Sequence, residues 1–270
     1  MKLLTLKPLI LLLASITLCL PFNASANITD LSSAINKAGR QRMLSQRIVA
    51  TYCQIGLNIK AEKSESQLMD AIALFEQQLE ELKAFRTTGA VNKQLQKVTE
   101  LWNPMRQIAS GDIDRTRATE LRNLAEDVLR ASHRVVILLQ DESGTSASRL
   151  VNISGRQRML SQRMSNLYML QSWGFTSSEY SGDYMTAINE FKGALSELNA
   201  SKLNNREINS SLEKVRKQFV IMEKSLKLKD GEYIPLMIKL SADKLLVMMN
   251  DITHMYEQVA KKPQTDLAAN

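Results

Sequence analysis

The feature that most constrains this 270-residue chain is a nine-residue segment, GRQRMLSQR, that occurs twice. It spans residues 39–47 and again residues 155–163, so that the two copies lie 116 positions apart. Asn36 precedes the first copy at the same offset at which Asn152 precedes the second. Self-similarity at a fixed period indicates one structural unit that occurs twice along the chain.

The composition predicts helix in both units. The chain has only ten glycines and five prolines, is rich in Leu, Gln, Glu, Lys and Ala, and shows no sustained alternation of β-branched residues. We expect an all-α fold with helices near residues 28–59, 65–86, 90–109, 114–140, 146–173, 181–200, 204–228 and 234–261. The 116-residue period groups these helices into two tandem antiparallel four-helix-bundle units, which can pack as a pseudo-twofold pair.

The first 26 residues are typical of a cleaved signal peptide. Lys2 and Lys7 precede an apolar run over 9–20, and Ala24-Ser25-Ala26 supplies a small-residue cleavage site. The first unit then covers 27–141, the second 142–262, and a polar tail 263–270. No later segment is apolar enough to cross a bilayer. We therefore expect a periplasmic or secreted protein that is not an integral membrane protein.

Charge and residue types exclude several function classes. The formal net charge of +7 falls to +5 without the predicted signal peptide, a modest excess that suits either anionic ligands or a solvated surface. Export argues against nucleic acid as a partner. Cys53 is the one cysteine after the signal and is expected in the core. His133 and His254 form no metal-binding pattern, and no catalytic grouping is present, so we expect no metal, no cofactor and no enzyme activity.

One arginine in each copy falls on the apolar face of its predicted helix. A helical wheel places Arg42 and Gln46 on the same face as Gly39 and the apolar residues. The second copy repeats the arrangement with Gly155, Arg158 and Gln162. One turn after each arginine, Gln46 and Gln162 can add amide donors to a bound ligand. Met43, Leu44, Met159 and Leu160 are expected in the core. Ser45 and Ser161 are expected to bond a carbonyl one turn back.

A buried guanidinium needs an anion or a set of acceptors, because it stays charged at ordinary pH. No Asp or Glu lies within one helical turn of Arg42 or Arg158. Three partners stay open: a carboxylate on a packing helix (Glu126, Asp127 or Asp243), backbone carbonyls, or a bound ligand. Glycine inside a helix costs about 1 kcal/mol relative to alanine, so Gly39 and Gly155 indicate a close approach or room for a small ligand.

The other arginines of the repeated segment lie on a different side of the wheel. We expect these to be charges that contact a protein partner: Arg40, Arg47, Arg156 and Arg163.

The segment Asn-x-x-Gly-Arg-Gln-Arg-Met-Leu-Ser-Gln-Arg resembles the signature of the PilJ-type sensor domain. That family includes the extracytoplasmic part of type IV pilus chemotaxis transducers and the related, NarX-like domain of nitrate/nitrite sensor kinases. The resemblance implies a four-helix bundle whose first helix carries the signature. In the nitrate-sensing relatives, two such helices present arginines to one small anion, which implies this role for Arg42 and Arg158. The basic residue before the glycine in those sensors falls on Lys37, whereas the second unit has Ile153 there.

Two functions follow as hypotheses. The first is an exported sensory protein that binds a small oxyanion, such as nitrate or nitrite, and presents it to a membrane sensor or transporter. This role would suit a chain that ends in a polar tail, since the sensor relatives carry membrane helices and signalling domains. The alternative is a helical interaction module for a pilus, chemoreceptor or envelope partner, with no small-molecule ligand.

Overall fold

A computed structural model describes residues 28–85, 88–226 and 234–262, and within these ranges it contains eight α-helices and no strand. The predicted all-α fold is confirmed. The helices are α1 (Leu31–Gly56), α2 (Ala61–Ala84), α3 (Gly89–Ala109), α4 (Ala118–Ser143), α5 (Ser146–Ser172), α6 (Ser178–Asn199), α7 (Arg206–Leu226) and α8 (Pro235–Ala260), and a short 3₁₀ turn, η1 (Arg115–Arg117), precedes α4. The predicted signal peptide and the tail 263–270 lie outside the described residues.

Local side-chain chemistry sets several of these helix ends. The Asp30 carboxylate accepts from the Ser33 amide at 2.9 Å and caps α1. The Thr145 hydroxyl accepts from the Ser148 amide at 3.1 Å and caps α5. Gly144 ends α4 with φ of 63°, a left-handed conformation that glycine adopts without steric cost. The break between α4 and α5 is therefore a tight turn, and α4 continues to Ser143, past the expected boundary at residue 141.

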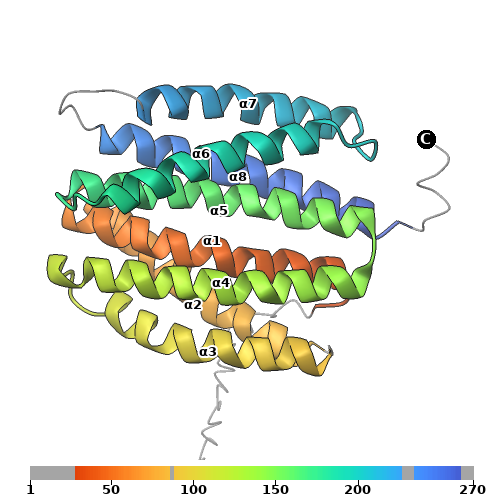
Figure 1. The fold of residues 1–270 in the computed structure, drawn as a ribbon, viewed down its shortest axis with the longest axis horizontal. Coiled ribbons are helices and arrows are strands. Elements are labelled where there is room, and N and C mark those ends of the chain that lie inside the picture. Colours follow the sequence, from red (N-terminus) through yellow and green to blue (C-terminus); the bar gives the residue numbers. More distant parts are fainter. Residues whose placement is uncertain (1–27, 86–87, 227–233, 263–270) are drawn as a thin grey trace, which may run out of the picture.

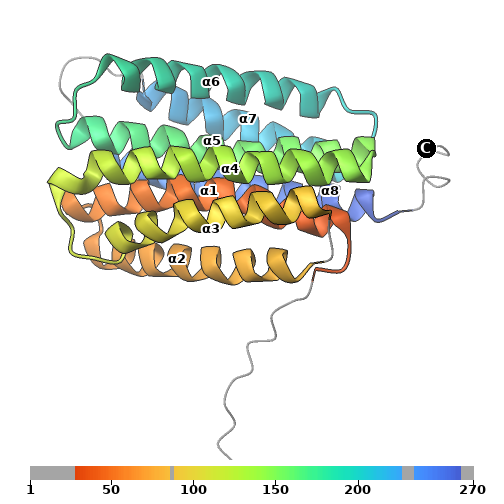
Figure 2. The same cartoon turned by 60° about the horizontal axis from the view of Figure 1, so that its bottom comes forward.

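The helices form two groups of four, α1–α4 and α5–α8, with the same packing in each. The first helix of each group packs on the second and fourth, and the third packs on the fourth. Figures 1 and 2 show α1 and α5 side by side in the middle of the molecule, with the remaining helices outside them. The two helices that carry GRQRMLSQR therefore form the contact between the two units.

The central helices α1 and α5 run parallel and nearly in register. Near their starts the Asn36 carbonyl accepts from Arg158, and in the middle Gln46 accepts from Asn166. At their ends the Trp173 ring occupies the space beside Gly56. Parallel packing of two equivalent helices makes their contacts reciprocal, as in the isologous interface of a homodimer.

Each unit has its own core, and the same aromatic pair recurs in both. Phe75 of α2 stacks on Trp102 of α3 with ring centroids 3.9 Å apart. Phe191 of α6 stacks on Phe219 of α7 at 4.2 Å. The packing of the second helix on the third is thus repeated along with the sequence motif.

The apolar positions of the repeated segment are buried, as predicted. This group contains Met43, Leu44, Met159 and Leu160, and Cys53 of the same helix face is also in the core. None of the described helices combines the length and the apolar character that crossing a bilayer requires.

Gly56 tests the close packing of α1 against the end of α5. A Cβ at this position would lie 2.1 Å from Cζ2 of Trp173, far inside contact distance. We expect Gly56→Ala to destabilise the protein by about 1–3 kcal/mol, because the ring must move out of its packed position. Urea denaturation measures the change.

Gly193→Ala in α6 is the matched control, since a Cβ there meets nothing within 4 Å. This variant should gain up to about 1 kcal/mol from helix propensity alone. Equal stability changes in the two variants would show that Trp173 does not constrain Gly56.

Candidate functional site

Arg42 and Arg158 meet inside the contact between α1 and α5. The two side chains are 1% and 0% exposed, and they rank among the largest fully buried side chains of the described residues. A Cβ on Gly39 would lie 3.2 Å from Nη2 of Arg42 and 3.7 Å from Nη2 of Arg158. Gly155 has the mirrored distances, 3.2 Å to Arg158 and 3.7 Å to Arg42. The two guanidinium groups therefore converge beside both glycines.

Arg42 is held by two neutral acceptors. Its Nη1 lies 3.0 Å from Nδ1 of His133 on α4. Its Nη2 donates to the Asn152 carbonyl of α5 at 3.3 Å. The first contact lies within the first unit and the second crosses to the other unit.

Arg158 repeats this arrangement with one difference. Its Nη1 donates to Oδ1 of Asn250 on α8 at 3.0 Å, so that asparagine stands where the first unit has a histidine. Its Nη2 donates to the Asn36 carbonyl at 3.3 Å and also to Oδ1 of Asn36 at 2.8 Å. Among the described residues, neither arginine thus forms a hydrogen bond or ion pair with a carboxylate.

The electrostatics of the pair are unfavourable without an anion. Burial, together with the charge of Arg156, lowers the pKa of Arg42 to about 9, so its guanidinium is still protonated at neutral pH. Burial and the charges of Arg40 and Arg42 lower the pKa of Arg158 well below its ordinary value. The Nε atoms of Arg42 and Arg158 are both buried with no hydrogen-bond partner. Two like charges with spare donors in a low-dielectric contact are suited to a small anion.

The alternative that Glu126, Asp127 or Asp243 pairs with the inward arginines is wrong. Glu126 accepts from Arg163 at 3.0 Å, and Asp243 accepts from Arg47 at 2.9 Å. Asp127 pairs with Arg130 on its own helix. Arg47 and Arg163 lie on the sides of α1 and α5 that face the fourth helix of the opposite unit. They therefore form ion pairs with Asp243 and Glu126, respectively.

The predicted partner-contact arginines mostly bind within the chain. Arg40 donates to Oδ1 of Asn250 at 3.2 Å, and Arg47 and Arg163 each form the ion pair described above with the other unit. Arg156 pairs with Glu190 at 3.0 Å and has a side chain that is 42% exposed. Three of the four therefore join the two halves of the molecule.

The remaining predicted anion ligands, Gln46, Gln162 and Lys37, bind other side chains and carbonyls of the chain. Oε1 of Gln46 accepts from Asn166 at 2.6 Å. Gln162 donates to the Ala242 carbonyl at 3.3 Å. Lys37 forms an ion pair with Glu81 on α2. These three side chains support the central helices from their flanks, while Gly39 and Gly155 alone adjoin the guanidinium groups.

Other residues of the repeat have roles that sequence reasoning missed. Gln41 donates to the Phe75 carbonyl at 3.1 Å, and Gln157 donates to the Phe191 carbonyl at 2.8 Å, which fastens each central helix to the next helix. The predicted serine bonds are confirmed, with Ser45 and Ser161 donating to the carbonyls three residues back. His133 and Asn250 occupy equivalent positions of α4 and α8. Finding this equivalence from the sequence would have required an alignment at an offset of 117 residues instead of 116.

A family model described as the N-terminal domain of type IV pili methyl-accepting chemotaxis transducers, PilJ, matches residues 24–128 and 142–234. The chain belongs to the PilJ family. The two matched segments correspond to two tandem copies, as the repeat predicts. No curated protein and no solved structure matches the chain.

The second PilJ match ends at residue 234, one residue before α8 begins. The structure nevertheless gives both PilJ units a fourth helix, because α8 packs on α5 as α4 packs on α1. The family and the helical fold suggest a sensory-transducer domain and not an enzyme. Within the described ranges, no three His, Cys, Asp or Glu side chains are grouped as metal ligands would be.

His133 should make the stability of this PilJ protein depend on pH. Burial and the charges of Arg42 and Arg156 lower the pKa of His133 to about 4, against 6.5 for a free histidine. The contribution of neutral His133 to the free energy of unfolding is therefore complete above pH 6.5. It is lost as the pH falls toward 4, because the unfolded chain takes up a proton that the folded protein does not. We expect a loss of about 1–2 kcal/mol, allowing for solvent screening of this half-buried ring.

The measurement is urea denaturation of the wild type and of His133→Asn at pH 7 and pH 4.5. His133→Asn installs the residue found at the equivalent position 250 and should abolish this part of the pH dependence. Identical pH profiles for His133→Asn and the wild type would contradict the assignment.

Proposed function

We propose that this PilJ-family chain is an exported sensory protein that binds a small oxyanion, such as nitrate or nitrite, between Arg42 and Arg158. The observation that carries the proposal is the convergence of two buried guanidinium groups beside Gly39 and Gly155, with only neutral hydrogen-bond acceptors in contact. A bound monoanion would offset part of this charge. The tandem units would then supply in one chain the two arginine-bearing helices that a dimeric sensor takes from two subunits.

The donor chemistry favours a planar oxyanion over a halide. A guanidinium presents several N–H groups in one plane, and two of them can bond two oxygens of the same ligand. Each arginine already uses Nη1 and Nη2 on neutral acceptors and keeps a buried Nε with no partner. An ion with several acceptor oxygens can satisfy spare donors from both side chains.

The location of the two arginines suggests how binding would be reported. The anion would lie on the contact between α1 and α5, which is where the two units are joined. A charge that attracts both arginines would stabilise this contact and alter the relation of the two units. We propose that the liganded form is recognised in the periplasm by a membrane sensor, a transporter or a pilus component.

The interaction-module alternative has less support. Arg40, Arg47 and Arg163, the charges expected to contact an external partner, bind the opposite unit of the same chain. A surface role for the repeated segment would also leave the burial of Arg42 and Arg158 unexplained.

Thermal denaturation in the presence of single anions tests the proposal. At a hundred times the dissociation constant a ligand stabilises the folded state by about 2.7 kcal/mol, which raises Tm by about 5–10 °C for a protein of this size. Nitrate and nitrite should produce this rise, with sulfate and chloride as comparison anions. Arg42→Met combined with Arg158→Met should abolish the rise while preserving the fold, because methionine fills much of the same apolar volume without the charge.

Arg130→Met is the matched control, since Arg130 lies on the exposed side of α4 and pairs locally with Asp127. It should respond to nitrate as the wild type does. A wild type that shows no shift with any anion, or a double variant that retains the shift, would rule out this function.

A further inference from the structure

Equivalent positions of α4 and α8 carry different charges beside the arginine pair. Asn152 donates from Nδ2 to Oε1 of Gln140 on α4 at 2.7 Å. Asn36, the equivalent residue of the first unit, donates from Nδ2 to Oε2 of Glu257 on α8 at 2.8 Å. A neutral amide thus stands on one side and a carboxylate on the other, at positions 117 residues apart.

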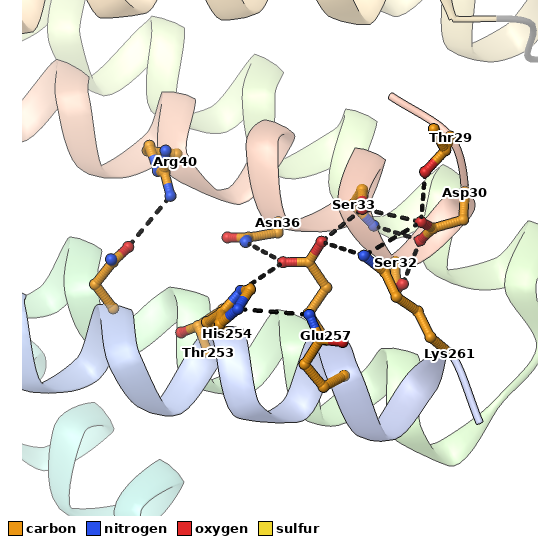
Figure 3. Close-up of polar contacts among 12 residues, drawn as sticks. Thr29, Asp30, Ser32, Ser33, Asn36, Arg40, Thr253, His254, Glu257 and Lys261 are labelled. Carbon is orange, nitrogen blue, oxygen red and sulfur yellow. Dashed lines mark hydrogen bonds and ion pairs between the residues drawn. The ribbon is translucent and has the colours of Figure 1, made fainter. Parts of the chain in front are cut away.

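Glu257 is buried in the contact between the two units and is hydrogen-bonded across it. It is 7% exposed, and it accepts from Ser33 of α1 at 2.5 Å as well as from Asn36. Lys261, the residue that follows α8, forms an ion pair at 3.2 Å with Oε1 of Glu257, the oxygen that also accepts from Ser33. Figure 3 shows the carboxylate in contact with Ser33 and Asn36 of α1, with His254 of α8 and with Lys261, which follows α8.

Asn36 couples this carboxylate to Arg158. Its amide nitrogen donates to Glu257, and its amide oxygen accepts from Nη2 of Arg158. On the opposite side, Oδ1 of Asn152 is buried without a hydrogen-bond partner, and Arg42 reaches only the Asn152 carbonyl. Arg158 is therefore connected to a carboxylate through one amide, whereas Arg42 ends on neutral groups.

The charged residues near Arg158 and near Arg42 differ in the same way, with a carboxylate, among the described residues, near Arg158 only. Glu257 raises the pKa of Arg158 against the larger lowering caused by burial and by the charges of Arg40 and Arg42, while the charge that acts on Arg42 is the positive one of Arg156. Glu190 pairs with Arg156 and is itself 33% exposed. The negative charge is therefore concentrated on the Arg158 half of the pair.

We infer that Glu257 is an internal counter-ion, linked to Arg158 through Asn36, that limits the affinity of the proposed oxyanion site. This inference rests on the proposed function for its ligand. A carboxylate one amide away from Arg158 repels any anion that the same guanidinium attracts, so its removal should tighten binding. Placing a carboxylate at Gln140 should weaken binding by giving Arg42 the environment that Arg158 has.

Calorimetric titration with nitrate at low ionic strength tests the inference on three variants. Glu257→Gln should bind about five- to tenfold more tightly than the wild type, and Gln140→Glu should bind more weakly by a similar factor. Glu120→Gln removes an exposed acid of α4 that pairs with Arg117, and should leave the affinity unchanged. A Glu257→Gln variant that binds nitrate as the wild type does, or more weakly, would overturn the inference while leaving the proposed function in place.

A second measurement needs no ligand and separates the two failures. Glu257→Gln is combined in turn with Arg158→Met and with Arg42→Met, and Tm is measured for each single and double variant. The effect of Glu257→Gln on Tm should shrink in the Arg158→Met background and stay unchanged in the Arg42→Met background. If the wild type binds no nitrate, the proposed function fails. Independently of that result, equal effects of Glu257→Gln on Tm in both backgrounds would overturn the counter-ion assignment.

Discussion

The structure depends on packing two positively charged side chains, Arg42 of α1 and Arg158 of α5, against each other. Arg42 and Arg158 lie buried in the contact between α1 and α5, and the residues that would normally fill such a contact are apolar. Placing two guanidinium groups there is costly in a low dielectric. The surrounding arrangement therefore follows from one requirement, that each arginine be supplied with acceptors from the opposite unit as well as from its own.

The repeated segment meets this requirement almost residue by residue. Its glycine leaves room beside the guanidinium groups, since a Cβ there would lie 3.2 Å from the nearer one, and its last arginine reaches the fourth helix of the opposite unit. Its first glutamine ties the central helix to the second helix of the same unit. The nine identical residues thus lie largely at the contact between the two parallel helices and at the junctions with the neighbouring helices.

The helices and the buried position of the arginines could be predicted from the sequence. The partners of most charged residues could not, for a definite physical reason. The helices follow from periodicity and from punctuation such as Gly144, and the inward position of Arg42 follows from a helical wheel. Both are local properties. The partners of Arg40, Arg47 and Lys37 are not, because they depend on which helix lies opposite. The contact of Arg42 with His133 and the pairing of Glu126 with Arg163 arise only when α4, α1 and α5 are brought together.

The central claim is that the parallel α1–α5 pair brings two charged arginines together around one small anion. A high-resolution crystal structure of the protein grown in nitrate tests this most directly. The account predicts a planar trigonal ion within hydrogen-bond distance of both Arg42 and Arg158, beside Gly39 and Gly155. Guanidinium groups that point apart, or that pair with carboxylates and bind no ion, would contradict it.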